Sequence, residues 1–508
     1  MESTENQSSG GRNLTQREKR WIIFALMIST ALAAIDVTIV STALPTIVAE
    51  LSGVALYSWL VSIYLLTSTT SVPLYGQLAD NLGRKPILIW GIILFTLASV
   101  LCTQARTMTQ LIIFRAIQGL GSGAILPMTM TIIGDLFKIE ERARYQGLFS
   151  GVWGVSSIVG PALGAFILMV WNWHGIFYIN LPVGITALFL VVKYFPERAV
   201  SQHRSVDVWG ALLMTAGVSA LLLAVEQNSS AGMASLSFYL TAAVCIIALI
   251  IVEKRASSPF LPVGLITRRL IGVSYLIAIF GGMLQFGTTA FMPLFVQGAL
   301  GGTPAAVGLT MAPMAVGWPL GSVLSGRLIL KLGYKRVLLL GMTCGVTGAS
   351  LLQLLNQSTP LIAVMGIIAL VGFSLGLTST PVIIAVQNAV AWNKRGITTA
   401  LNQFSRTIGG VIGVAVMGAL LNRQLSGYIS GSKLTAGVNA SDLIRDMLDP
   451  AKRVNYATEV LHAVQRDLAG ALHTAYALPL IAAVIALLLI IFAFPAGNVE
   501  KHAVEDSV

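Results

Sequence analysis

Asp36 is the acidic residue best placed to do chemistry in this sequence, because it lies alone inside a long apolar segment. The segment Trp21–Leu44 contains no other charged residue. A lone carboxylate at the centre of a membrane helix costs about 2.5–3.5 kcal/mol on insertion scales, so it usually faces a protein interior or a wet cavity. Such a carboxylate can bind and release protons, or it can hold helices together through hydrogen bonds. The first role is the working hypothesis here.

Arg115 is a second charge inside an apolar segment, 109–133. At a rise of 1.5 Å per residue, Asp36 lies about 14 Å below the outer end of its segment at Pro45, and Arg115 lies about 9 Å below the same surface, counted from Thr109. The side chains are therefore predicted to share a cavity and to pair in at least one state. Coulomb attraction and desolvation act in opposite directions on such a carboxyl, so a change in distance or wetting would load or release a proton. A structural role for Arg115, tying helices together, is the alternative.

Composition indicates a polytopic membrane protein. The 508 residues are 55% hydrophobic and 10% charged, whereas soluble proteins carry about 25% charged residues. The net charge of +11 is therefore interpreted through topology and predicts no nucleic-acid partner. Cysteines at 102, 245 and 344 and the five histidines form no metal-binding pattern. No phosphate-binding loop is present, and no enzyme activity, metal or cofactor is predicted.

Fourteen apolar runs of the length needed to span a bilayer predict an all-α protein. They cover 21–44, 55–76, 86–104, 109–133, 144–169, 175–195, 207–226, 235–253, 271–297, 305–326, 337–356, 360–386, 396–421 and 471–494. With the N-terminus inside, 23 of the 32 Lys and Arg residues fall in inside connections and the short outside loops hold one, Arg106. The positive-inside rule thus predicts cytoplasmic termini in a cell (inner) membrane.

An internal repeat divides the chain. Gly76, Leu78, Leu82, Gly83 and Lys85 align with residues 250 positions later: Gly326, Leu328, Leu332, Gly333 and Lys335. The offset equals eight spans, which predicts two six-helix bundles, 21–206 and 271–494, separated by two inserted helices and a linker, 207–270. Cytoplasmic tails are predicted at 1–20 and 495–508. Internal repeats of this kind are typical of transporters, with the substrate site between the halves.

The connection Gly76–Pro86 combines turn-forming glycines with opposite charges at helix ends. Asp80 is followed by Arg84 and Lys85, with Gly83 before them. We interpret Gly76, Asp80, Gly83, Arg84 and Lys85 as a cytoplasmic latch that forms in one state and breaks in another. A plain basic loop that only obeys topology is the alternative, and it has more weight for the second copy, which has no acid.

The long connection 423–470 lies outside both bundles. Val460, Leu461, Val464 and Leu468 have helical apolar spacing. The stretch is expected to be an amphipathic segment on the headgroups, with an outer cap or a docking face for a periplasmic adaptor protein as alternatives.

Several motifs resemble those of the major facilitator superfamily, and within it the fourteen-span drug:proton antiporter family. The matching stretches are Ile35–Pro45, Gly76–Pro86, Arg115–Gly123, Gly160–Gly164, Trp173–Pro182 and Phe404–Gly410. The loop motif departs from the family pattern at Asn81, and Ser156 replaces a glycine upstream of Gly160. The resemblance implies the superfamily fold and a link between antiport and Gly160, Pro161 and Gly164. Ordinary small-residue packing is the alternative for these three.

The resulting prediction is a proton-coupled secondary transporter that exports amphipathic drugs or toxic compounds by alternating access. Tyr64, Gln285, Asn402 and Arg406 are candidates for the substrate cavity, as are Trp153 and Phe286. A role in holding helices together is the alternative for Arg406, and packing or anchoring in lipid is the alternative for the aromatic side chains. No second acid lies deep in a span, so either Asp36 meets both cation and proton, or the substrates are neutral, zwitterionic or anionic. The alternatives are a dedicated metabolite exporter or proton symporter of the same fold, and a receptor or scaffold that transports nothing.

Overall fold

The computed structural model describes residues 15–51, 57–137, 139–196, 208–226, 233–253, 263–431 and 456–495. No strand occurs in these ranges. The apolar runs form helices because a helix pairs its own backbone N–H and C=O groups, which lipid cannot do. Thr15 and Glu18 begin the first helix with a capping box.

Eighteen elements follow one another along the described chain. The first are α1 (Gln16–Glu50), α2 (Tyr57–Leu82), α3 (Arg84–Cys102), α4 (Met108–Leu136), α5 (Ile139–Val170), α6 (His174–Tyr178), α7 (Asn180–Tyr194), α8 (Val208–Glu226) and α9 (Met233–Glu253). The others are α10 (Val263–Ile266), α11 (Arg269–Leu294), η3 (Phe295–Ala299), α12 (Pro304–Leu352), α13 (Leu361–Asn388), η4 (Trp392–Lys394), α14 (Arg395–Gly431), α17 (Thr458–Leu488) and η5 (Leu489–Ala493).

Nine helices of the described part are long and apolar enough to cross a membrane by length and composition. The element α12 is bent at Gly333, whose φ of 77° and ψ of 168° are not helical. It therefore joins the segments 305–326 and 337–356, which the sequence predicts separately. Gly83, at the aligned position of the first repeat, has a φ of 97° between α2 and α3. Both turns use a left-handed conformation that favours glycine.

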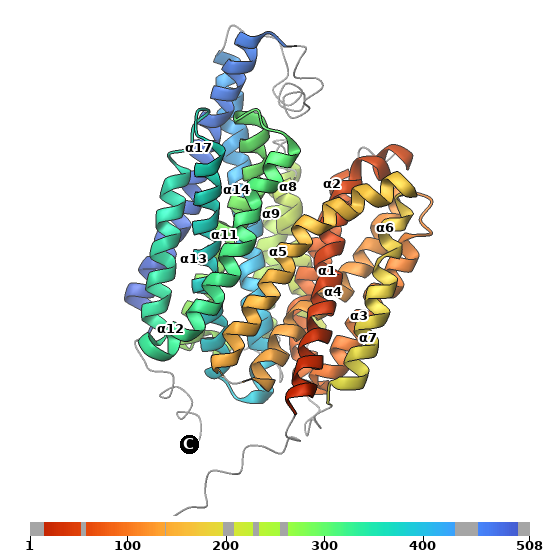
Figure 1. The fold of residues 1–508 in the computed structure, drawn as a ribbon. Helices are drawn as coiled ribbons and strands as arrows, with labels where there is room; N and C mark the ends of the chain where they lie inside the picture. Colours follow the sequence, from red (N-terminus) through yellow and green to blue (C-terminus); the bar gives the residue numbers. More distant parts are fainter. Residues whose placement is uncertain are drawn as a thin grey trace, which may run out of the picture.

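The buried apolar side chains gather in separate cores for the two parts of the chain. We call α1–α7 the N-terminal bundle and α11–η5 the C-terminal bundle. One core runs from Ile22 to Phe195 and another from Val273 to Phe494. In Figure 1 the bundles lie close together at the lower end, where α1 begins, and their ribbons diverge toward the upper end.

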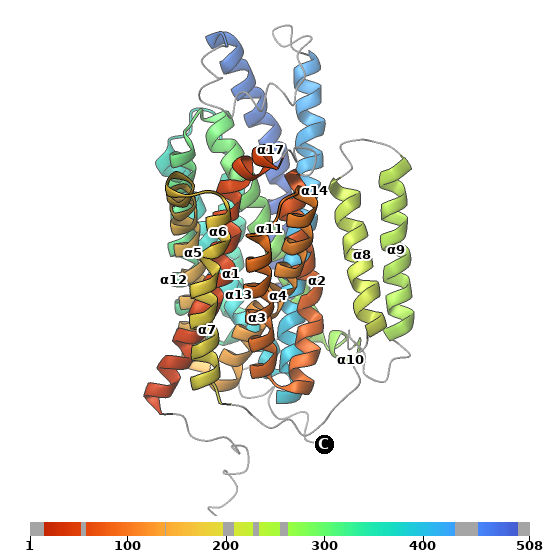
Figure 2. The ribbon, with the colours of Figure 1, turned by 90° about the vertical axis from the view of Figure 1, so that its right-hand side faces the viewer.

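Two lateral seams join the bundles. On one seam α5 contacts α12, and on the other α2 contacts α14. The helices α8 and α9 pack on each other and lie to one side of the molecule (Figure 2). Met214 and Val218 of α8 join an apolar cluster with residues of α2 and α14, including Leu74 and Phe404. The inserted helices therefore cover the α2–α14 seam.

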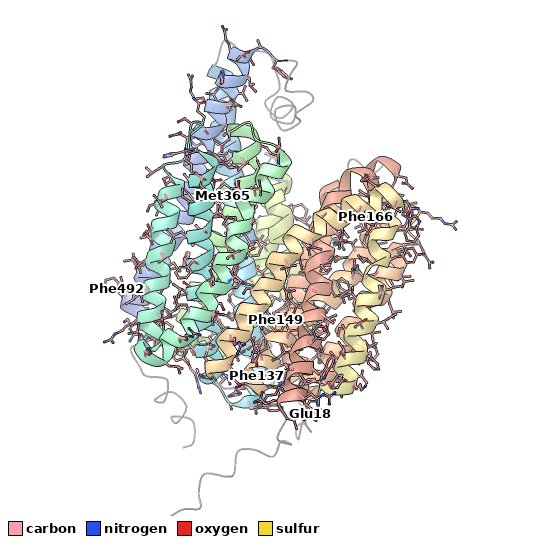
Figure 3. All side chains as sticks on the ribbon, viewed as in Figure 1. Glu18, Phe137, Phe149, Phe166, Met365 and Phe492 are labelled. Carbon is pink, nitrogen blue, oxygen red and sulfur yellow. The ribbon has the colours of Figure 1, made fainter. Side chains whose placement is uncertain are left out.

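Large apolar side chains cover much of the outer surface. Phe166 and Phe492 are 62% and 72% exposed and lie at the edge of the ribbon in Figure 3. Soluble proteins rarely expose apolar patches of this extent. The surface is that of a protein embedded in lipid.

The connection 423–470 differs from the expectation. The helix α14 continues to Gly431 and α17 begins at Thr458, so both ends of the stretch continue spanning helices, and they project above the other helices in Figure 1. Val464 is buried among Tyr456, Val460 and Leu461. These side chains therefore form a local apolar cluster at the start of α17. Residues 432–455, and with them any adaptor-docking face there, lie outside the described residues.

Candidate functional site

Asp36 and Arg115 form an ion pair in the interior of the N-terminal bundle. Arg115 Nη1 of α4 donates to Asp36 Oδ2 of α1 at 2.5 Å. The two residues are 0% and 2% exposed. The two side chains therefore pair, as the comparable depths calculated from helix rise predicted. Their part in proton coupling stays a prediction.

Three uncharged polar residues complete the shell around the carboxylate. Gln118 Nε2 of α4 and Asn180 Nδ2 of α7 donate to Asp36 Oδ1 at 2.9 and 2.8 Å. Both amides also donate to Ser99 Oγ of α3, at 2.8 and 3.2 Å, and Gln118 Oε1 accepts from Arg115 Nη1 at 2.7 Å. Four helices thus meet at one carboxylate, which we call the Asp36 cluster.

Tyr64 belongs to this cluster. The Arg115 guanidinium lies 4.3 Å from the centre of the Tyr64 ring, and the Tyr64 hydroxyl donates to Ser122 Oγ at 2.8 Å. Tyr64 is 2% exposed, so in this structure it does not line an open substrate cavity as the sequence suggested. It shields the guanidinium, whose Nε has no hydrogen-bond partner among the described residues.

The Asp36 cluster is closed to bulk solvent, because Asp36 and Arg115 are both buried. A carboxylate that accepts three hydrogen bonds and is removed from solvent cannot exchange a proton until the surrounding helices move. Breaking such a pair leaves an uncompensated buried charge, which costs about 3–5 kcal/mol. The arrangement can therefore link the protonation of Asp36 to the positions of α1, α3, α4 and α7.

The small residues of α5 lie directly against the helix that carries Asp36. A Cβ at Gly160 would collide with the Thr38 side chain, and Thr38 Oγ1 donates to the Ser156 carbonyl at 2.9 Å. Gly164 is buried, and the side chain of Pro161 lies outside the described part. The motif therefore sets a close contact between α1 and α5, and α5 in turn packs on α12 of the other bundle.

Arg84 is the centre of a second polar cluster, at the end of the molecule where the bundles meet. It pairs with Asp80 Oδ1 at 2.8 Å and with Asp135 Oδ2 at 3.0 Å. It also donates to the Trp392 carbonyl at 2.7 Å, and its guanidinium stacks 3.9 Å from the Trp392 ring centre. Since Trp392 belongs to the C-terminal bundle, Arg84 joins the two bundles.

Asp80 joins the bundles through a helix terminus. Its carboxylate accepts from the backbone N–H groups of Gly396 and Ile397, at 2.9 and 2.8 Å. These are unpaired donors in the first turn of α14, where the helix dipole favours an anion. Asp80 of one bundle thus caps a helix of the other.

The remaining predicted latch residues have distinct places. A Cβ at Gly76 would lie 2.5 Å from Ala400 Cβ, so glycine permits the close approach of α2 and α14. Lys85 donates to the Val192 carbonyl of its own bundle at 3.1 Å, and its repeat partner Lys335 donates to the Ile491 carbonyl at 2.8 Å. Lys85 therefore stabilises a bundle, and the second copy follows the same geometry without crossing to the other bundle.

Further contacts between the bundles were not anticipated from the sequence. Arg142 Nη1 donates to Asn388 Oδ1 at 2.8 Å, and Arg395 Nη1 lies 3.4 Å from Asp135 Oδ1. Gln387 Nε2 donates to the Met130 carbonyl at 3.3 Å. In place of the predicted set, we use the name latch for Asp80, Arg84, Asp135, Trp392, Arg395 and the first turn of α14.

Arg406 lies within the C-terminal bundle, apart from both clusters. Its Nη2 donates to Gln403 Oε1 at 2.9 Å, and its guanidinium lies 5.5 Å from the Trp318 ring centre. Gln285 Oε1 and Asn402 Nδ2 are buried polar atoms without a partner among the described residues. Gly282, one turn before Gln285, packs against the Arg406 backbone.

The molecule is thus a helical membrane protein with a buried charge pair in one bundle and polar links between two bundles. The sequence matches the Major Facilitator Superfamily over residues 26–414, and the chain belongs to this superfamily of membrane transporters, which are not enzymes.

Its relatives include transporters of drugs. The chain is 35% identical to the multidrug transporter protein MdtP of Bacillus subtilis, covering 91% of this chain and 84% of that protein. It is 30% identical to multidrug resistance protein 3 of the same organism, covering 94% and 95%. The fold is similar to that of the proton:xylose symporter XylE, with a TM-score of 0.63, 13% identity and coverage of 95% and 97%.

Proposed function

We propose that the chain is a proton-coupled antiporter that exports amphipathic drugs or toxic compounds by alternating access. The observation that carries the proposal is the buried Asp36–Arg115 pair inside a superfamily member with a multidrug transporter among its relatives. An ionisable group held inside a membrane bundle is costly and is a functional site by default.

The topology proposed is fourteen spans with both termini in the cytoplasm of a cell (inner) membrane. Each predicted apolar run overlaps a described helix, with α6 and α7 together forming one span and the bent α12 supplying two. The basic residues of the latch lie at the end that the positive-inside rule assigns to the cytoplasm. A periplasmic adaptor protein stays a candidate partner.

In this proposal the structure is an outward-facing arrangement. The latch ties the cytoplasmic ends of the bundles, and the ribbons diverge at the other end (Figure 1). Rocking of the bundles breaks the latch and moves α5 against α12. Because Thr38, two residues after Asp36, bonds to α5, the same motion reaches the Asp36 cluster and lets its carboxyl exchange a proton with the newly opened side.

Arg406 is proposed to meet an anionic group of the substrate. Residues 254–441 contain no Asp or Glu, so none of the helices from α11 to α14 carries an acid that could pair with it. Its described contacts are a neutral amide and an aromatic ring, which leave donors for a ligand. Gln285 and Asn402, with unpartnered polar atoms, supply neutral hydrogen-bonding groups nearby.

Replacing Arg406 by Gln is expected to remove selectivity for charge. A hydrogen bond to a charged group contributes about 1.5–3 kcal/mol, so the affinity for an amphipathic naphthalene sulfonate should fall roughly tenfold to a hundredfold. The affinity for the uncharged sulfonamide with the same naphthyl skeleton should change little. Equilibrium binding to the purified protein measures both. Arg406→Lys, which keeps the charge, is the matched control. Equal loss for both ligands would assign Arg406 to packing.

Reconstituted vesicles test the function itself. With an imposed proton gradient, purified protein should move amphipathic compounds against their concentration gradient, with protons moving the opposite way. Collapse of the gradient by an ionophore should stop accumulation. Movement of protons and compound in the same direction would identify a symporter, and no coupled movement with any compound of a cationic, neutral and anionic panel would refute the proposal.

A further inference from the structure

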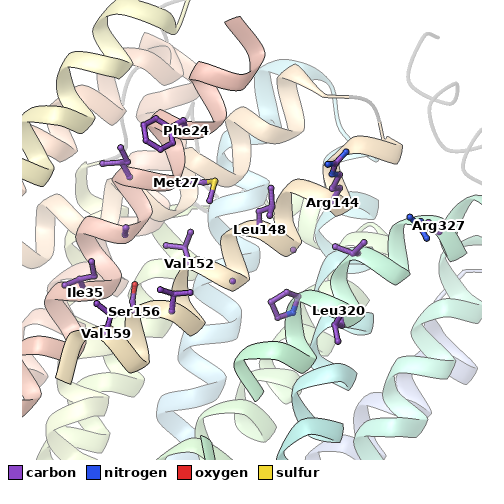
Figure 4. Close-up of a pocket in the computed structure, with 17 residues that line it drawn as sticks. Phe24, Met27, Ile35, Arg144, Leu148, Val152, Ser156, Val159, Leu320 and Arg327 are labelled. Atoms are coloured by element: carbon purple, nitrogen blue, oxygen red, sulfur yellow. The ribbon is translucent and has the colours of Figure 1, made fainter. Parts of the chain in front are cut away.

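A groove of about 1020 Å³ runs along the α5–α12 seam. Figure 4 shows its lining by α1, α5 and α12. Most of the lining is apolar and includes Phe24, Met27, Leu148, Val152 and Leu320. Phe24, Leu148 and Leu320 are 48%, 43% and 59% exposed. The groove is therefore open at the side of the protein, along the α5–α12 seam.

Two arginines mark one end of the groove. Arg144 of α5 and Arg327 of α12 lie toward the same end of the groove in Figure 4, away from Ile35 and Val159 at the other end. Both side chains are exposed, and no ion pair holds either of them within the described part of the chain. Arg144 lies five residues after the start of α5 and Arg327 six residues before the bend at Gly333. Both are thus within about 9 Å of the cytoplasmic ends of their helices.

The two seams between the bundles differ in what covers them. The α2–α14 seam is covered by α8 and α9 through the apolar cluster around Met214 and Val218. No described helix covers the groove on the α5–α12 seam, which faces the surroundings with apolar side chains and two cations. In a membrane those surroundings are lipid, and the cytoplasmic leaflet carries anionic headgroups.

We propose that the groove is a binding site for one anionic glycerophospholipid of the cytoplasmic leaflet. Its phosphate lies between Arg144 and Arg327, and an acyl chain lies along the apolar lining toward Ile35. Guanidinium groups bind phosphate oxygens through charge-assisted hydrogen bonds. Because the arginines belong to opposite bundles, the lipid bridges the bundles and stabilises the arrangement in which the latch is closed.

Gly151 offers a way to block the groove. A Cβ at this position would meet only Pro319 Cγ, at 3.9 Å, so a larger side chain can extend into the groove without displacing the backbone. Gly147 is different, because its Cβ would lie 2.6 Å from Val323 Cγ2. Gly151→Phe therefore fills the groove, whereas a substitution at Gly147 would disturb helix packing.

Native mass spectrometry of the full-length protein in detergent, titrated with phosphatidylglycerol and with phosphatidylcholine, tests the proposal. The wild type should retain phosphatidylglycerol preferentially. Arg144→Gln with Arg327→Gln should weaken its retention roughly tenfold or more with little effect on phosphatidylcholine, and Gly151→Phe should reduce both lipids. Lys331→Gln with Arg336→Gln removes two exposed charges near the same bend of α12 and should leave retention unchanged.

The outcomes separate lipid binding from general effects. Unchanged phosphatidylglycerol retention by the Arg144/Arg327 variant, or an equal loss by the Lys331/Arg336 control, would overturn the proposal. The proposal would also be overturned if Gly151→Phe weakened the binding of an amphipathic drug, added in a parallel titration, and left the retention of phosphatidylglycerol unchanged. Gel filtration and thermal unfolding establish that each variant is folded. The test measures no transport, so its result is independent of proton coupling.

Discussion

Replacing Asp36 by Asn is expected to abolish accumulation of substrate driven by a proton gradient in reconstituted vesicles. The amide occupies the same volume but does not take part in the proton cycle, so the coupled step has no carrier. Exchange of labelled for unlabelled substrate without a gradient should continue, because it requires binding and rocking but no net proton movement. Full gradient-driven accumulation by this variant would show that another group carries the proton.

The same substitution should also destabilise the protein, and the two effects must be separated. Asp36→Asn leaves Arg115 as an unpaired buried cation, and breaking a buried pair in this way costs about 3–5 kcal/mol. Arg115→Gln combined with Asp36→Asn removes both charges and should regain much of the lost stability. Thermal unfolding of the single and double variants forms a double-mutant cycle that measures the coupling of the pair.

The double variant distinguishes the roles of the Asp36 cluster. If the pair served only to hold α1 and α4 together, restored stability would restore gradient-driven transport. If Asp36 carries the proton, the double variant should be stable and still uncoupled. Gln118 and Asn180, which donate to the carboxylate, remain able to bond to an amide oxygen in both variants.

Replacing Asp80 by Ala is expected to open the latch. The change removes the ion pair with Arg84 and the acceptor for the first turn of α14. Hydrogen bonds to charged groups contribute about 1.5–3 kcal/mol, which corresponds to a shift of roughly tenfold to a hundredfold toward the inward-facing arrangement. Spin labels at Arg20 and Arg336, exposed positions on opposite bundles, report the distance between the bundles.

Lys85 provides the matched control for the latch. It lies in the same connection as Asp80 but donates to Val192 of its own bundle. Lys85→Gln should therefore leave the distance distribution between the bundles unchanged. A longer distance in the Lys85 variant, or an unchanged one in the Asp80 variant, would contradict the assignment of the latch.

Much of the fold and part of the site could be predicted from the sequence, because lipid restricts the chain to long apolar helices. Helix rise alone placed Asp36 and Arg115 at comparable depth, and the structure joins them. The repeat also aligned Gly83 with Gly333 as turn glycines, and both have a positive φ in the structure. These features depend on local spacing, which a sequence records directly.

Features that depend on tertiary packing were missed. Gln118, Asn180 and Ser99 are uncharged and lie among many similar polar residues, so nothing in their spacing indicates that they meet one carboxylate. Trp392 lies 308 residues from Arg84, and only the arrangement of the two bundles shows that they touch. Tyr64 was assigned to a cavity because the sequence of the α2 segment does not reveal which face of the helix packs on Arg115.

Proton release by the purified protein tests most directly whether Asp36 carries the proton. In weakly buffered detergent solution with a pH indicator, addition of a transported substrate should release protons from the wild type, with an amount that depends on the starting pH. The Asp36→Asn/Arg115→Gln protein should bind the same substrate and release none. Proton release of wild-type size from this variant would contradict the account.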